Sequence, residues 1–249
     1  VQGLAVKYTG IEELVKRYDH LDRVLLTAST VIQNLDVLTE LENRRNEVEA
    51  ELRQLREARQ QELQSIINVP TPAKVRVHTS LKAHKDTLAI NEGVRLFTNL
   101  TTHPAIEGRQ VRIEAQFPNR SGVLRSQYVG FSTIRMTPGE DASTILHELG
   151  HWLEDMDKRI LKQSLAFLKR RAGTEPTECL RDLTGNPHYG ADERAWKDKF
   201  LDPYMGKDYH GEASEILSMG MEYLYRYPQL FAQHDPEYFA FVYNRLRGR

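Results

Sequence analysis

The pentapeptide His147-Glu148-Leu149-Gly150-His151 constrains this chain more than any other part of its sequence. Residues four apart project from one face of an α-helix, with Cβ atoms about 6 Å apart, so both imidazoles can point at one ion. Leu146, Trp152 and Leu153 flank the pentapeptide and indicate a helix that is buried on at least one side. Two histidines and a glutamate on a buried helix are costly without partners. The pattern therefore predicts a zinc site, with Glu148 placed to take a proton from the water that the ion activates.

A helix around the pentapeptide is also predicted by its start signal. Thr137 suits the N-cap, Pro138 the first helical position and Glu140 the third, which together make a capping box. We expect the helix to run from about Pro138 to past Asp155, so that both histidines lie in its middle.

A catalytic zinc ion usually has three protein ligands, so a third is needed. Glu215 is favoured because its neighbours are small or apolar, and a buried carboxylate needs a partner such as zinc. Glu222, seven residues on, shares its helix face and can support the site from behind. Glu212, Glu222 and Asp157 remain alternative ligands. Asp157 is disfavoured because Glu154, a good helix former, should continue the helix and point Asp157 away.

Composition limits the class of protein. With 249 residues the chain can bury one substantial core, or one core plus an appendage, and 34 basic residues nearly balance 35 acidic ones. Nothing in that balance indicates a nucleic-acid partner. The single cysteine, Cys179, excludes an internal disulfide and a cysteine-based zinc cluster, and it fits a reducing compartment. No apolar run approaches the roughly 20 residues of a membrane span, so no membrane partner is expected. The start at Val1, without Met or a signal-peptide pattern, fits a segment of a longer polypeptide.

The first third of the chain is predicted to be a helical arm, residues 1–69, ahead of a second domain at 70–249. No Pro or Gly occurs from Ile11 to Ile67, and apolar residues recur three or four apart at Leu38, Leu41, Val48, Leu52, Leu55 and Ile66. We expect a long exposed helix or a helical hairpin with a narrow apolar stripe. Its partner helix can belong to this chain, a second copy or another protein, and a plain structural arm is favoured. Pro70-Thr71-Pro72 marks the boundary.

Beyond that boundary the pattern changes to short strands and predicts an α+β fold with a small mixed sheet and a C-terminal helical subdomain. Lys74–His78 alternates, and Gln110–Phe117 does so more clearly, with Val111, Ile113, Ala115 and Phe117 on one face; Pro118–Gly122 is a turn. Ser126–Met136 is expected to be one strand, and its part Tyr128–Met136 the edge that pairs with an extended substrate. Loops, with room for one short helix, follow at 173–207. A helix is then expected from His210 to Tyr227, ended by Pro228, and a last helix from Asp235-Pro236 with Phe239, Val242, Tyr243 and Leu246 on its apolar side.

His147-Glu148-x-x-His151 followed by a Glu on a downstream helix resembles the gluzincin branch of the zincin metallopeptidases. The block around Glu215 is similar to metallopeptidase domains of phage-encoded, head-morphogenesis-associated proteins, and loosely to lethal-factor-type toxin proteases. The resemblance covers about Gln110 to the C-terminus and leaves the arm unmatched. It implies one zinc ion per chain on His147, His151 and Glu215, with Glu148 as general base and Tyr209 steadying the oxyanion.

The sequence departs from the thermolysin-like pattern at Met219, where an acid is usual. Glu154 or Asp155, one turn past His151, can orient an imidazole instead. His210 is a second candidate for holding the oxyanion.

These observations predict a zinc-dependent endopeptidase acting on a protein or peptide, cytoplasmic or associated with a phage particle. A different reading is a phage assembly or structural protein that keeps the fold without turnover and binds phage proteins or a second copy through its arm. A third is an injected or secreted protease effector, which deep and specific pockets would favour.

Overall fold

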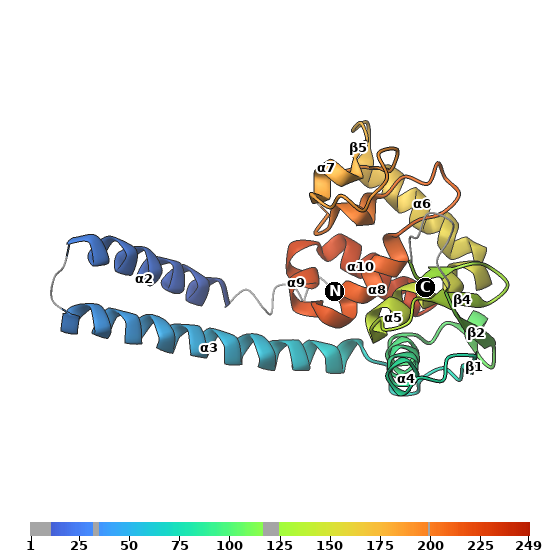
Figure 1. The fold of residues 1–249 in the computed structure, drawn as a ribbon, viewed down its shortest axis with the longest axis horizontal. Helices are drawn as coiled ribbons and strands as arrows, with labels where there is room; N and C mark the ends of the chain where they lie inside the picture. The colour runs from blue at the N-terminus through green and yellow to red at the C-terminus, as the bar shows by residue number, and fades with distance from the viewer. Residues whose placement is uncertain (1–10, 32–34, 117–124, 199) are drawn as a thin grey trace. The chain divides into compact units, whose positions relative to one another are not determined.

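The structure is a computed structural model that describes residues 11–31, 35–116, 125–198 and 200–249, and it has the expected α+β architecture (Figure 1). The chain divides into two compact units. One comprises Val1–Ile66 with Pro228–Pro236, and the other comprises Ile67–Tyr227 with Glu237–Arg249. Within the described ranges, no helix combines the length and the apolar character needed to cross a membrane.

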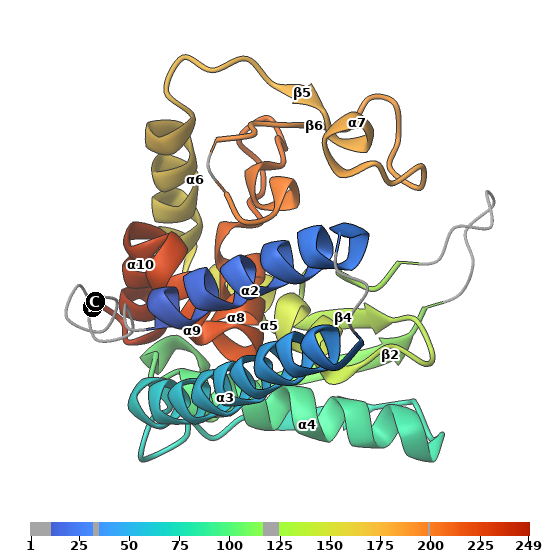
Figure 2. The ribbon, with the colours of Figure 1, turned by 90° about the vertical axis from the view of Figure 1, so that its left-hand side faces the viewer.

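The first unit contains a helical hairpin rather than one long helix. Helices α2 (Ile11–Val31) and α3 (Leu35–Ile67) run side by side (Figures 1 and 2), and Arg45 Nη1 on α3 lies 3.4 Å from Asp22 Oδ1 on α2. Val48 and Leu52 of the expected stripe are buried. Ile66 is 40% exposed, so its assignment to the stripe was wrong. Helix α9 (Pro228–His234) also belongs to this unit and begins at the proline that was expected only to end a helix.

The second unit contains a four-stranded mixed sheet in the order β1-β2-β4-β3. Its strands are β1 (Arg76–Thr79), β2 (Gln110–Ala115), β3 (Gln127–Tyr128) and β4 (Thr133–Met136). Strands β1, β2 and β4 are parallel, and β3 is antiparallel to β4. The expected alternation in β2 is confirmed, because Val111 and Ile113 are buried, and Ile113 pairs with the buried Ile134 of β4. Phe117 and the turn predicted at Pro118–Gly122 lie outside the described residues.

The prediction of one strand over Ser126–Met136 was wrong, because the chain reverses within it. Gly130, Phe131 and Ser132 all have positive φ, of 84°, 50° and 53°. These left-handed residues turn the chain, and β3 pairs back on β4 with Tyr128 opposite Ile134. Strand β4 is therefore an inner strand, and only the two residues of β3 lie at this edge of the sheet.

The helix of the pentapeptide, α5 (Ala142–Met156), packs between α4 (His84–Leu100) and α8 (Ile216–Arg226). Glycines allow both close approaches. A Cβ at Gly93 of α4 would lie 2.6 Å from Ile145 Cβ, and a Cβ at Gly150 of α5 would lie 2.8 Å from Ser218 Cα. No helix was predicted for the α4 segment.

The start of α5 lies four residues later than predicted. Gly139 has a φ of 92°, and its N–H donates to Asp86, so the segment from Thr137 forms a turn instead of a first helical turn. Asp141 is the true N-cap, because its carboxylate accepts from the N–H groups of Ser143 and Thr144.

Helix α6 (Lys158–Ala172) follows α5 directly. The segment predicted as loops with room for one short helix does contain such a helix, α7 (Leu180–Thr184). It also holds a two-stranded sheet of β5 (Glu178–Cys179) and β6 (Arg194–Ala195) and a 3-10 turn, η2 (Pro203–Gly206), which were not predicted. The last helix, α10 (Pro236–Leu246), is confirmed with Phe239, Val242 and Leu246 buried. Helix α8 begins only at Ile216, because His210 and Gly211, with φ of 54° and 86°, do not continue a helix.

We expect Gly150→Ala to destabilise the protein by about 1–3 kcal/mol, because the added methyl group must displace the backbone of α8 at Ser218. On an exposed helix the same change would stabilise by up to about 1 kcal/mol, so the sign distinguishes the two situations. The free energy of unfolding from urea titration measures the effect. Lys162→Ala on the exposed face of α6 is the control, and an equal or stabilising effect at Gly150 would contradict the close packing.

A second prediction concerns pH and stability. His103 is only 4% exposed at the N-cap of the short helix Pro104–Ile106, and its Nδ1 accepts from the Ala105 N–H at 3.2 Å. Burial lowers the pKa of His103, against the opposing effect of Asp157, whose Oδ2 lies 3.5 Å from Nε2. The unfolded chain therefore binds this proton more tightly, with a pKa of about 6.5.

The stabilisation by neutral His103 is thus present above about pH 6.5 and is lost as the pH falls below it. The difference in free energy of unfolding between wild type and His103→Gln should shrink from pH 7.5 to pH 5. Urea titration of both proteins at each pH, in a buffer that contains a metal chelator, measures this difference. Parallel pH profiles for the two proteins would contradict the assignment.

Candidate metal centre

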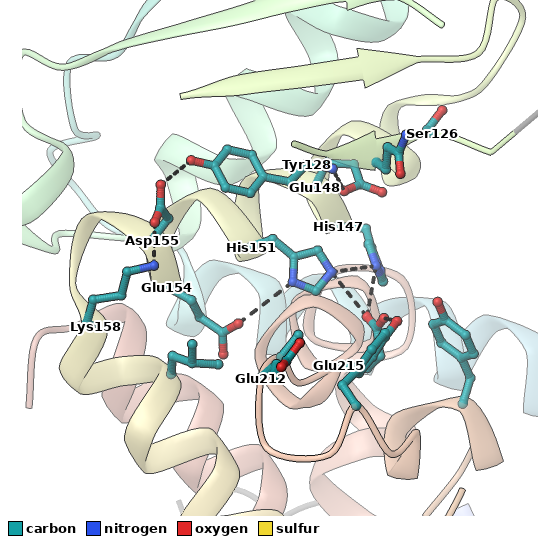
Figure 3. Close-up of a pocket in the computed structure, with 15 residues that line it drawn as sticks. Ser126, Tyr128, His147, Glu148, His151, Glu154, Asp155, Lys158, Glu212 and Glu215 are labelled. Carbon is teal, nitrogen blue, oxygen red and sulfur yellow. Dashed lines mark hydrogen bonds and ion pairs between the residues drawn. The ribbon is translucent and has the colours of Figure 1, made fainter. Parts of the chain in front are cut away.

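The close approach of α5 to α8 at Gly150 brings the two histidines next to Glu215. His147 and His151 project from α5, and Glu215 occupies the N-cap position of α8. Glu215 is thus at the end of its helix, not within it as predicted. Its carboxylate is only 2% exposed and points at the two imidazoles (Figure 3).

Three atoms converge on one point in this cluster. His147 Nε2 lies 3.1 Å and His151 Nε2 3.2 Å from Glu215 Oε2, and the two Nε2 atoms are 3.2 Å apart. A tetrahedral zinc ion with bonds of about 2.0–2.1 Å holds its ligand atoms about 3.3–3.4 Å apart. The triangle therefore has nearly the size that such an ion requires, and the two nitrogens and one carboxylate oxygen are ligands that zinc takes. His147, His151 and Glu215 form a group that can hold a metal ion.

The outer nitrogen of each imidazole faces a second carboxylate. His147 Nδ1 lies 2.9 Å from Glu222 Oε1. His151 Nδ1 lies 3.7 Å from Glu154 Oε2 (Figure 3). Glu154 is held in turn by a hydrogen bond from Ser164 Oγ at 2.7 Å. A carboxylate behind Nδ1 favours a proton there, which leaves Nε2 free to bind a metal. The supporting positions expected for Glu222 and Glu154 are confirmed.

Two hydroxyl groups hold Glu215. Tyr209 donates to Oε1 at 2.5 Å, and Ser218 donates to Oε2 at 2.7 Å. Ser218 was not identified from the sequence, although its position three residues after Glu215 near the start of α8 was a usable signal. The hydroxyls fix the carboxylate where both Nε2 atoms meet it.

The charges of the cluster reinforce one another. Burial alone would lower the pKa of His147, but Glu215 and Glu222 raise it to about 9, and Glu215 and Glu154 likewise raise the pKa of His151. The two imidazoles hold the pKa of Glu215 well below its usual value against the effect of burial. Burial and the Glu215 charge raise the pKa of Tyr209, which keeps its hydroxyl protonated as a donor. The cluster thus favours a cation at its centre, either a proton or a metal ion.

Glu148 lines the same cavity, of about 350 Å³, as the three convergent residues. Its Oε2 accepts a hydrogen bond from the Tyr128 N–H of strand β3 at 2.6 Å. Tyr128 N–H lies on the outer edge of β3. Glu148 accepts its hydrogen bond, so this donor is not open to a further strand. The Tyr128 hydroxyl donates to Asp155 on α5, so that side chain spans from the sheet to the helix (Figure 3). Tyr128 was expected only as part of an edge strand.

Other candidate residues lie apart from the convergent group. Asp157 ends α5 and caps α6, and its carboxylate binds Arg159 with an Nη2 to Oδ2 distance of 2.6 Å. Glu212 lines the cavity but is exposed, and it is not one of the three convergent residues. The His210 imidazole is 85% exposed and lies near Asp208. Asp155 binds Tyr128 and Lys158 and makes no contact with either imidazole among the recorded interactions of the described residues.

No protein-family model, curated protein or solved structure matches the chain. The assignment of a metal-binding class therefore depends on the geometry of the two histidines and the glutamate.

Replacement of Glu215 should abolish stoichiometric zinc binding, because it removes both a ligand and the charge that offsets the burial of an ion. We expect about one zinc per chain in wild type and at least a 10-fold loss of affinity in Glu215→Gln, by elemental analysis and competition with a chelator. Glu212→Gln, which changes an exposed carboxylate in the same cavity, is the matched control. Loss of zinc in Asp157→Asn with retention in Glu215→Gln would overturn the ligand set.

Proposed function

We propose that the chain is a zinc-dependent endopeptidase with one zinc ion held by His147, His151 and Glu215. The observation that supports this proposal is the convergence of three ligand atoms beside Glu148 in one cavity. A bound zinc ion would polarise a peptide carbonyl and make water acidic enough to be deprotonated near neutral pH.

Glu148 is proposed as the general base. It is the residue after His147 on α5, and it lines the cavity into which the imidazoles point. Its carboxylate would accept the proton of the attacking water and pass it to the leaving amine. The hydrogen bond from Tyr128 N–H holds one carboxylate oxygen, Oε2, and orients the group without a counter-charge.

Tyr209 is proposed to stabilise the oxyanion or to hold the proposed zinc ligand Glu215 in position. Its hydroxyl donates to Glu215 at 2.5 Å, so it would reach an oxyanion only by giving up that bond. Tyr204 lines the same cavity, and its ring centre lies 6.5 Å from that of His147. The exposure of the His210 imidazole makes Tyr209 the better candidate of the two that the sequence offers.

A second candidate function is assembly without turnover, with partner binding through the first unit. The exposed large apolar residues Leu26 and Leu35 of α2 and α3 favour this reading. The partner would be a second copy or a phage structural protein, and the site of action would be the cytoplasm or a phage particle.

Glu148→Gln tests the proposed function. A glutamine keeps an oxygen that can accept from Tyr128 N–H but cannot take up a proton, so zinc content should be unchanged while peptide hydrolysis falls by about 10²–10⁴-fold. Cleavage of a denatured protein, followed by mass spectrometry, measures the loss, and Glu212→Gln is the control. Full activity in Glu148→Gln would refute its role as base. A zinc-loaded wild type that cleaves nothing would favour the assembly reading.

A further inference from the structure

A second cavity, of about 420 Å³, adjoins the cavity of the metal centre. Tyr209 and Ala213 line both cavities, so the two share one wall. The volume is in the range of about 300–1,000 Å³ that is typical of sites for small ligands. The other lining residues come from α6, from Trp196 and from the segment before α8.

Helix α6 carries a continuous apolar face from one cavity to the other. Leu161 lines the cavity of the metal centre, and Leu165, Leu168 and Ala172 line the second cavity. The spacings of four, three and four residues place these side chains on one side of the helix. The indole of Trp196 adds a further apolar surface, whereas Lys169 and His210 are exposed.

The shared wall is held in place by several contacts. Tyr209 is bound to Glu215, and Lys207 Nζ lies 4.7 Å from the centre of the Tyr209 ring. The Asp208 carboxylate accepts from the His210 N–H at 2.8 Å. With both His210 and Gly211 in the left-handed region, the chain bends sharply before it reaches Glu215. The second cavity is therefore built into the same segment that places the third convergent residue.

We propose that this second cavity binds an apolar side chain, of the leucine or phenylalanine class, in the peptide whose scissile bond lies at the metal centre. The inference rests on the proposed function, and it names a substrate class for it. An extended peptide advances about 3.3 Å per residue and turns alternate side chains to one side, so a residue beside the scissile bond can direct its side chain past Tyr209. Burial of such a side chain corresponds to a preference of about 10-fold or more over glycine.

Binding can be measured without turnover by NMR of the two tryptophan indoles. Trp196 lines the second cavity, and Trp152 is fully buried with its Nε1–H bound to Ser132, so Trp152 is an internal reference. Titration with N-acetyl-leucinamide should shift the Trp196 indole signal in a saturable way and leave that of Trp152 unchanged. N-acetyl-glycinamide should bind at least about 10-fold more weakly. Equal responses to the two amides would overturn the inference.

A matched pair of substitutions on α6 tests the location. Ala172→Phe fills the second cavity, and Ala166→Phe places the same side chain on the exposed face of the helix. The first should abolish the Trp196 response to the leucine amide, and the second should retain it. Because Ala172 is buried, Leu165→Asn is a second variant, which makes the half-buried wall polar and should weaken binding at least about fivefold. If Ala172→Phe or Leu165→Asn folds and still binds the leucine amide as wild type does, the amide binds outside the second cavity.

Cleavage of a peptide library by the zinc-loaded protein then tests the substrate class. We expect leucine and phenylalanine to be enriched at one position beside the scissile bond, with the preference lost in Leu165→Asn and kept in Ala166→Phe. Cleavage without that preference would overturn the inference while leaving the proposed function intact. If the amide binds at Trp196 but the wild-type protein cleaves no peptide, the proposed peptidase function is refuted while binding in the second cavity is retained.

Discussion

The buried carboxylate of Glu215 is the group on which the rest of the second unit's site depends. A charge that is 2% exposed would be very costly alone, and here two imidazoles and two hydroxyl donors surround it. Those partners come from α5, from α8 and from the segment before α8. The carboxylate can be satisfied only when these parts are packed together, so the fold and the site form as one arrangement.

Packing of the two helices makes this arrangement possible. Gly150 lets α5 approach α8 so closely that a Cβ would lie 2.8 Å from Ser218 Cα. Ser218 then donates its hydroxyl to Glu215, so the same residue that forms the contact surface also supports the carboxylate. Gly150 therefore permits the close packing of α5 against α8. This packing in turn sets the positions of His147 and His151 relative to Glu215.

The sequence predicted the parts of the site that depend on local spacing. His147, His151 and their common face follow from the helical period, and Glu215 followed from the apolar surroundings of a single carboxylate. What failed depends on backbone conformations that the sequence expresses weakly. Phe131, Ser132 and His210 are left-handed without being glycine, and they produced a hairpin and a late helix start where regular elements were predicted.

The same limitation explains which functional contacts were missed. The link from Tyr128 N–H to Glu148 joins residues 20 positions apart, through a two-residue strand that carries almost no periodic signal. The second cavity likewise requires knowing that the helix is interrupted at the extended residue Asp157, where α5 ends and α6 begins, whereas a continued helix was expected there. Local patterns identify candidate ligands well, whereas the walls of a cavity depend on where the chain changes direction.

Tyr209 connects the two cavities to the candidate metal centre. Its hydroxyl donates to Glu215, and Tyr209 lines both cavities. In the proposed complex, a side chain in the second cavity would contact Tyr209, the residue that donates a hydrogen bond to the candidate ligand Glu215. Lys207 Nζ lies over the same ring and pairs with Glu193 at 2.7 Å, so movement of the Tyr209 ring would disturb this ion pair's surroundings as well as the hydrogen bond to Glu215. A wall tied down by several contacts before a ligand arrives loses little freedom on binding, so the proposed site would select its ligands mainly by shape.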